Sequence, residues 1–68
     1  MLFINSDIFA PVLSILQKAL ELYPNDKEIY LFTGIFYANH QDYSNAIRLW
    51  ENGLKLSPND KRFKDNIR

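Results

Sequence analysis

The chain has 68 residues, of which 47% are apolar, 15% aromatic and 24% charged, with no cysteine and one histidine. This composition fits one small folded domain and excludes a disordered chain, a multidomain enzyme, a disulfide-stabilised fold and a zinc site built from cysteine and histidine. Eight Lys and Arg balance eight Asp and Glu. The zero net charge argues against a protein whose main task is to bind nucleic-acid phosphates or an anionic membrane.

The first 26 residues begin with an apolar run and predict a helix over about residues 9–23. The run lacks a basic leading segment and is interrupted by polar residues at positions 5–7 and by Pro11, so we interpret it as folded protein and not as a signal peptide. Pro11 fits the first turn of a helix, where its missing N–H costs no hydrogen bond. No apolar stretch reaches the roughly 20 residues that span a bilayer. We expect a soluble protein without a membrane partner, and the absence of cysteine fits a cytoplasmic location.

Apolar residues at three- and four-residue spacing predict two further helices, over residues 27–40 and 43–56. Asn25 followed by Glu28 resembles a capping box at the start of the first, and Asp42 or Ser44 can cap the second. The polar connection between them is short, so the two helices must fold back on each other. A short terminal helix is predicted from about residue 60, and most of the basic residues of the C-terminal end lie in it.

An internal repeat is the most informative feature of the chain. Ala19 to Lys27 reappears as Gly53 to Lys61 with six of nine residues identical, an offset of 34 residues. The same offset pairs further residues: Phe3 with Tyr37, Val12 with Ala46, Leu13 with Ile47, Ile15 with Leu49, and Leu16 with Trp50. We therefore predict one all-α domain of antiparallel helix-turn-helix repeats. Residues 1–26 would form the second half of one repeat, residues 27–60 a complete repeat, and residues 61–68 the start of a terminal capping helix.

A helix-turn-helix period of 34 residues resembles the tetratricopeptide repeat (TPR). Tyr30-x-x-Thr33-Gly34-x-x-Tyr37 stands where the family has Trp-x-x-Leu-Gly-x-x-Tyr, Ala46-x-x-x-Trp50 stands for Ala-x-x-x-Phe, and Pro58 closes the unit. The resemblance covers about one and a half repeats and implies a TPR-like α-solenoid fragment. We expect a core that contains Leu16, Leu20, Tyr30, Gly34, Tyr37, Ala46, Trp50 and Leu54.

The resemblance also implies a protein–protein interaction module, because the first helix of each repeat lines the concave side of the stacked array. The residues of that helix predicted to face a protein or peptide partner are Glu28, Leu31, Ile35, Ala38 and Asn39. This predicted stripe is mostly apolar, which argues against a clamp for carboxylate tails. It favours an apolar ligand or a second copy of the chain.

Self-association is predicted because one and a half repeats cannot bury all of their apolar faces, and about three repeats are normally needed. Either the chain forms a homo-oligomer or it is a fragment of a longer repeat array. The adhesive ends would be residues 1–4 and 63–67. The residues predicted to take part in self-association are Phe3, Phe32, Phe36, Phe63 and Ile67.

No sequence pattern points to catalysis, a cofactor or a metal site. The two glycines cannot form a phosphate loop, no serine lies in a nucleophile elbow, and His40 is expected at the surface near a helix end. We therefore predict that the protein is not an enzyme and binds no cofactor and no metal. The alternative is an RNA-binding helical-repeat fragment that uses the basic C-terminal end, where Phe63 lies among cations. The zero net charge argues against a nucleic-acid partner.

Overall fold

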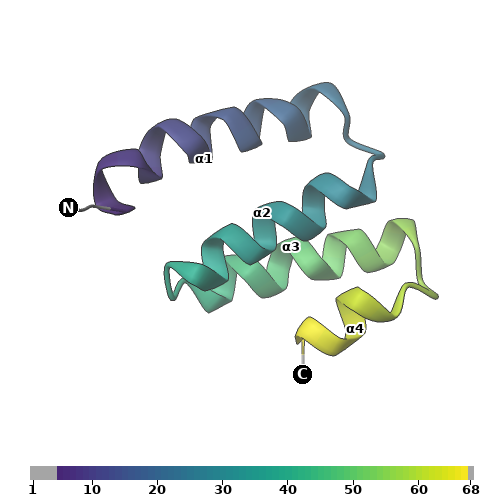
Figure 1. The fold of residues 1–68 in the computed structure, drawn as a ribbon. Coiled ribbons are helices and arrows are strands. Elements are labelled where there is room, and N and C mark those ends of the chain that lie inside the picture. The colour runs from purple at the N-terminus through teal and green to yellow at the C-terminus, as the bar shows by residue number, and fades with distance from the viewer. Residues whose placement is uncertain (1–4, 68) are drawn as a thin grey trace.

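The computed structural model describes residues 5–67 as four α-helices joined by short turns (Figure 1). Helix α1 spans Asn5–Leu22, α2 spans Lys27–Asn39, α3 spans Tyr43–Leu56 and α4 spans Lys61–Ile67. No strand occurs in this part of the chain. The predicted all-α fold of helix-turn-helix pairs is confirmed. Within the described residues, no helix combines the length and apolarity needed to cross a membrane.

Helix α1 begins earlier than predicted. It starts at Asn5 and not near residue 9, so Pro11 lies inside the helix and not in its first turn. At that position a proline removes one backbone hydrogen bond of the helix. The prediction of the helix start was wrong because it relied on the fit of a proline to the first turn of a helix, and in the structure the helix has already begun before Pro11. The 34-residue offset pairs Ile8 with Asp42, the residue that caps α3, so the sequence has no preferred capping residue at the counterpart position.

The two Pro-Asn-Asp turns, which share a sequence, also share their hydrogen bonds. Each turn has one bond that closes the preceding helix and a second that spans the turn itself. In the first turn, the Tyr23 N–H donates to the Ala19 carbonyl at 2.8 Å and the Asp26 N–H to the Tyr23 carbonyl at 3.1 Å. The counterpart bonds run from Ser57 N–H to the Gly53 carbonyl at 3.0 Å and from Asp60 N–H to the Ser57 carbonyl at 3.1 Å.

The aspartates of these turns cap the helices that follow. Asp26 accepts from the Glu28 N–H at 3.1 Å at the start of α2, and Asp60 accepts from the Arg62 N–H at 3.0 Å at the start of α4. A carboxylate in this position satisfies an otherwise unpaired N–H and interacts favourably with the helix dipole. The α2 cap is therefore Asp26, one residue later than the predicted Asn25.

Helices α2 and α3 form the antiparallel pair that holds most of the core. The turn between them contains Gln41 in the left-handed region, with φ 66°, and Asp42 caps α3 by accepting from the Asn45 N–H at 3.3 Å. Four predicted core residues are buried and four are half-buried. The buried ones are Gly34, Tyr37, Ala46 and Trp50, and the half-buried ones are Leu16, Leu20, Tyr30 and Leu54.

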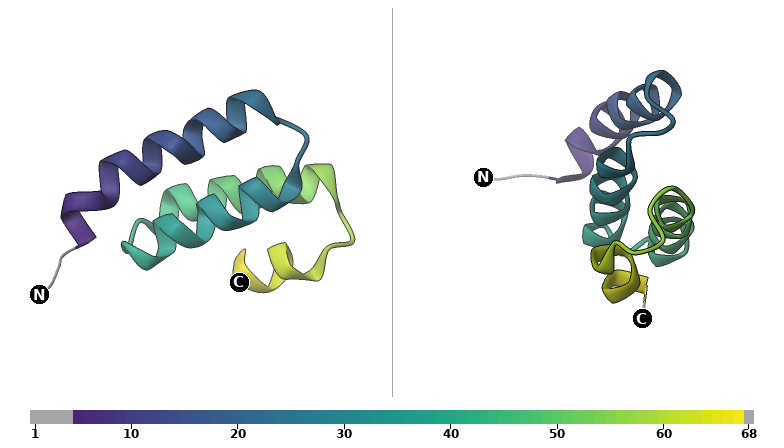
Figure 2. Two further views of the ribbon diagram at one scale, coloured as in Figure 1. Left: turned by 45° about the horizontal axis from the view of Figure 1, so that its top comes forward. Right: turned by 90° about the vertical axis from the view of Figure 1, so that its right-hand side faces the viewer.

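The four helices form a thin layer and not a sphere. Helices α1 and α4 lie at its opposite edges with α2 and α3 between them (Figures 1 and 2). The radius of gyration is 12.3 Å and the extents are 41 × 28 × 16 Å. A compact chain of this length would have a radius of gyration of about 11 Å. The smallest extent is taken up by α2 and α3 side by side (Figure 2), and several apolar side chains stay exposed at the faces of this layer.

Candidate functional site

The outer side of α2 carries an exposed stripe of side chains. Glu28, Phe32, Ile35 and Asn39 follow helical spacing on the side of α2 opposite its buried residues. We call these four residues the α2 stripe. At its middle, 56% of Phe32 and 37% of Ile35 are exposed. The stripe is therefore apolar at its centre and polar at both ends.

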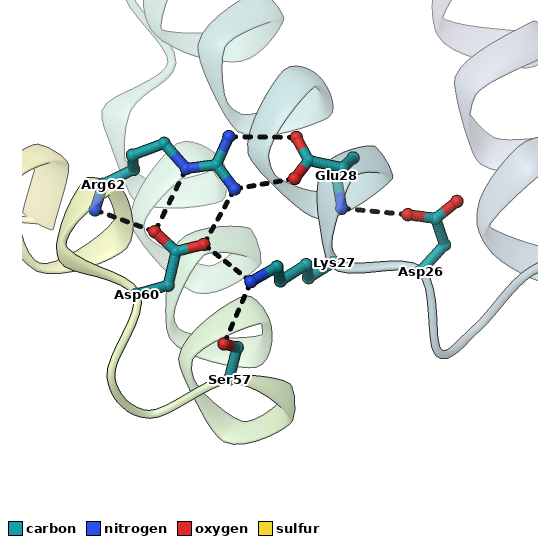
Figure 3. Close-up of polar contacts among 6 residues, drawn as sticks. All are labelled: Asp26, Lys27, Glu28, Ser57, Asp60 and Arg62. Atoms are coloured by element: carbon teal, nitrogen blue, oxygen red, sulfur yellow. Dashed lines mark hydrogen bonds and ion pairs between the residues drawn. The ribbon is translucent and has the colours of Figure 1, made fainter.

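A charge network closes one end of the α2 stripe and joins α2 to α4 (Figure 3). The Arg62 guanidinium donates to both carboxylate oxygens of Glu28, at 3.0 and 2.7 Å. It also donates to both oxygens of Asp60, at 3.1 and 2.8 Å. Lys27 Nζ lies 3.1 Å from an Asp60 carboxylate oxygen and donates to Ser57 Oγ at 3.1 Å. Two cations and two carboxylates thus neutralise one another.

The network keeps both carboxyl groups ionised at neutral pH. Hydrogen bonds from Arg62 hold the pKa of Asp60 well below its usual range, and Lys27 adds to the effect. The same guanidinium lowers the pKa of Glu28, while the two carboxylates raise the pKa of Arg62. Because Arg62 and Lys27 are already paired, neither of these two cations is free to bind a carboxylate tail.

Two residues of the predicted partner-binding set do not lie at the surface. Leu31 is only 4% exposed, and its carbonyl accepts a hydrogen bond from Trp50 Nε1 at 3.2 Å. Ala38 is half-buried and packs against the core. Placing these two residues on the stripe was wrong, because adjacent helical positions differ in direction by about 100° and only packing against α3 shows which side is covered. Glu28, Ile35 and Asn39 lie on the α2 stripe, and Phe32 takes the place of Leu31.

The predicted adhesive C-terminal end is folded onto its own chain. Phe63 has no exposed surface, and its ring occupies the space that a side chain at Gly53 would need. Ile67 is half-buried and packs against the core. Phe63 and Ile67 are therefore internal contacts of the single chain. Phe3 and the rest of residues 1–4 lie outside the described residues.

The other two residues predicted for self-association lie on α2. Phe32 belongs to the α2 stripe. Phe36 is half-buried and stacks on Phe9 of α1 with ring centroids 5.1 Å apart. The structure therefore brings one predicted self-association residue, Phe32, into the same surface as the predicted partner-binding residue Ile35. One exposed surface of α2 thus combines residues from both predicted sets.

His40 lies among aromatic rings and not at the surface, where it was expected. Its Nδ1 is 2.9 Å from the Phe36 carbonyl, and its ring centroid is 4.7 Å from those of Phe9 and Phe36. Among residues 9–67, whose side chains the structure describes, no group of three or more His, Asp or Glu side chains is placed to hold a metal ion. The RNA alternative loses support as well, because the buried Phe63 cannot stack on a base and Arg62 is held in the charge network.

A second exposed surface, which sequence reasoning missed, runs along α1. It is a shallow groove of about 630 Å³ whose apolar side chains come from Ile15, Ala19, Leu22 and Tyr23. We call it the α1 groove. Its sequence signal is the seven-residue spacing of Ile15 and Leu22, which puts both side chains on one side of a helix. The helix was predicted, but its outward side was not.

Fold and site together define a small all-helical protein of antiparallel helix pairs with two exposed apolar surfaces. Comparison of the chain with protein-family models, with curated proteins and with solved structures found no match in any of the three.

Proposed function

We propose that the chain is a TPR-like protein-interaction module that binds an apolar segment of a partner protein on the α2 stripe. The observation that carries the proposal is the exposure of two adjoining large apolar side chains, 56% for Phe32 and 37% for Ile35, on a helix whose opposite side is firmly buried. Large apolar side chains grouped at a surface are typical of interaction sites.

The internal repeat supports the TPR-like architecture. The 34-residue offset relates α1 to α3 and α2 to α4, and the counterpart turns share their hydrogen bonds. In this interpretation α2 is the first helix of the complete repeat, the helix that the family resemblance assigns to the binding surface. The outer side of α2 is also where the structure has its exposed Phe32 and Ile35.

The charges around the α2 stripe favour an apolar ligand. At one end Glu28 is neutralised by Arg62, and at the other end Asn39 is an uncharged amide. A partner that places apolar side chains against Phe32 and Ile35 meets no unpaired charge that it would have to desolvate. An acidic tail would find no free cation within the network. We therefore propose a peptide or helix with apolar side chains at its centre as the ligand.

Selection of peptides from a displayed random library against the folded chain tests the proposal. We expect peptides with apolar residues at their centre, whose binding is insensitive to salt and weakens at least tenfold with Phe32→Glu or Ile35→Glu. The matched control is Leu56→Glu, because Leu56 is 40% exposed but belongs to α3 and not to the stripe. Circular dichroism checks that each variant keeps its helices. Peptides that bind both stripe variants as tightly as the unmodified chain would contradict the proposal.

A further inference from the structure

The α1 groove has more exposed apolar surface than the α2 stripe. Exposure reaches 68% for Ile15 and 60% for Leu22, two residues seven positions apart on one side of α1. Tyr23, at the end of the groove, is 60% exposed. The other side of α1 carries the residues that pack against the core, among them Phe9, Leu13 and Leu20. Helix α1 is therefore apolar on two sides, and the chain itself covers only one of them.

The internal repeat shows that two residues on the open side of α1, Ile15 and Ala19, correspond to residues that α3 buries. Ile15 is the 34-residue counterpart of Leu49, which is only 4% exposed. Ala19 is the counterpart of Gly53, which lies beneath the Phe63 ring. On α3 this side is covered by neighbouring helices of the same chain. On α1 the equivalent residues line the groove, so the groove has the composition of a helix–helix contact without the second helix.

The spacing along the groove suits a second copy of α1 running antiparallel. In such a pair, a twofold axis beside Ala19 puts Ile15 of one copy opposite Leu22 of the other, and the reverse contact follows by symmetry. The small Ala19 side chain at the centre allows the two helices to approach closely. Contacts of this isologous kind are the commonest way in which identical chains associate.

The charges at the edge of the groove select the antiparallel arrangement. Lys18 and Glu21 lie on the same edge, with their charged atoms 3.9 Å apart and 69% and 73% of their side chains exposed. Such an exposed pair within one helix contributes little and is free to exchange partners. In an antiparallel pair the charged edges of the two helices adjoin, so Lys18 of each copy lies beside Glu21 of the other. In a parallel pair the two charged edges would lie on opposite sides of the interface, and no Lys18–Glu21 ion pair could form between the copies.

We propose that two copies of the chain associate through their α1 grooves as an antiparallel helix pair, with Ile15 opposite Leu22 and reciprocal Lys18–Glu21 ion pairs. This interface is separate from the α2 stripe, so the chain can bind a peptide with or without pairing. Either proposal can therefore fail without the other.

Sedimentation equilibrium from micromolar to millimolar chain concentration measures the association. We expect a reversible dimer for the unmodified chain, a monomer for Ile15→Glu, and a dimer for Leu56→Glu. Leu56 is the matched control because it is the 34-residue counterpart of Leu22 and is also exposed, at 40%. A monomer at all concentrations would overturn the proposal. So would a dimer that survives Ile15→Glu, or one that is lost with Phe32→Glu, which would assign pairing to the α2 stripe.

Charge exchange tests the antiparallel register. Lys18→Glu and Glu21→Lys each place like charges across the interface and should weaken the dimer about tenfold at low salt. The double variant restores opposite charges in both pairs and should recover most of the affinity. If the affinity of the double variant does not recover, the two α1 helices meet in another register or α1 contacts a different helix. Either result would overturn this arrangement.

Cross-linking gives a readout that does not depend on affinity. The chain has no cysteine, so Ala19→Cys introduces a single thiol next to the proposed twofold axis. A disulfide needs Cα atoms within about 7 Å. We expect mild oxidation to convert Ala19→Cys to a covalent dimer much faster than the control Leu56→Cys. Equal rates for the two variants would overturn the proposal.

Discussion

Gly34 on α2 packs directly against the Trp50 ring on α3. A Cβ atom at Gly34 would collide with the indole ring. The same ring is fixed by the hydrogen bond from its Nε1 to the Leu31 carbonyl, so it cannot move away without losing that bond. Glycine at this position is what allows α2 and α3 to bury a tryptophan between them.

Gly34→Ala should therefore destabilise the chain although alanine is the better helix former. The collision with Trp50 costs about 1–3 kcal/mol, which exceeds the gain of about 1 kcal/mol in helix propensity. Urea unfolding should show a lower free energy of unfolding for this variant. Glu51→Ala, at an exposed position of α3, is the control and should change stability little. A Gly34→Ala variant as stable as the unmodified chain would contradict the packing described.

The hydroxyl of Thr33 is a buried group whose removal should not lower the free energy of unfolding. Thr33 is 1% exposed, and its Oγ1 has no hydrogen-bond partner among the described residues. Burying an unpaired hydroxyl is unfavourable, so Thr33→Val should leave stability unchanged or raise it by about 1 kcal/mol. Thr33→Ser keeps the hydroxyl and loses a methyl group, which should cost about 1 kcal/mol. Thermal unfolding of the two variants makes the comparison. A marked loss of stability in Thr33→Val would show that the hydroxyl is bonded.

Among the helices, α4 depends most on its neighbours. Its seven residues are too few to form a stable helix alone. Phe63 anchors it over Gly53, and the charge network of Lys27, Glu28, Asp60 and Arg62 fixes its first turn. Its remaining residues are mostly exposed and polar. This helix therefore covers part of the core and presents a polar surface to solvent.

The charge network should make stability depend on pH at the acid end. Because the pKa of Asp60 is lowered by folding, its stabilising effect is complete above the ordinary aspartate pKa of about 3.9 and decreases as the pH falls toward the lowered value. Asp60→Asn keeps a capping side chain but removes the charge. We expect the variant to be less stable at pH 7 and the difference to shrink by pH 2.5 in urea unfolding. A difference that stays constant over this range would contradict the argument.

At the scale of the whole molecule, the described residues have more large apolar side chains exposed than buried. The described residues have six buried hydrophobic residues: Leu31, Tyr37, Ala46, Leu49, Trp50 and Phe63. The large exposed ones are Ile15, Leu22, Tyr23, Phe32, Ile35, Tyr43 and Leu56. A domain of this length has a small stability margin. Covering one exposed surface should therefore have a measurable effect on unfolding.

Thermal unfolding should consequently depend on chain concentration. If two copies pair through the α1 groove, mass action raises Tm as the concentration increases. We expect a rise of several degrees between about 10 µM and 1 mM for the unmodified chain, from linkage of association to folding. Ile15→Glu should show a constant Tm over the same range. A constant Tm for both would agree with a monomer and contradict the pairing.

Helix order, helix type and most helix ends follow from local sequence, because caps, prolines and apolar spacing act within a few residues. Short-range rules account for the capping residues of three helices, which are Asp26, Asp42 and Asp60. The Pro-Asn-Asp turn has the same hydrogen bonds at both of its positions. The start of α1 was the exception. There a proline that fits a helix start lies inside a helix that begins at Asn5.

Which side of each helix is covered depends on contacts between residues far apart in the chain. Periodicity shows that α1 and α2 are apolar on more than one side, but it does not distinguish Leu31 from Phe32, or Ile15 from Leu20, as the buried residue. Packing decides this: Trp50 covers the Leu31 side of α2, and the core takes the Leu20 side of α1. For the same reason Phe63, which was predicted to take part in self-association, is the most deeply buried of the described aromatic rings, and Ile15 remains at the surface.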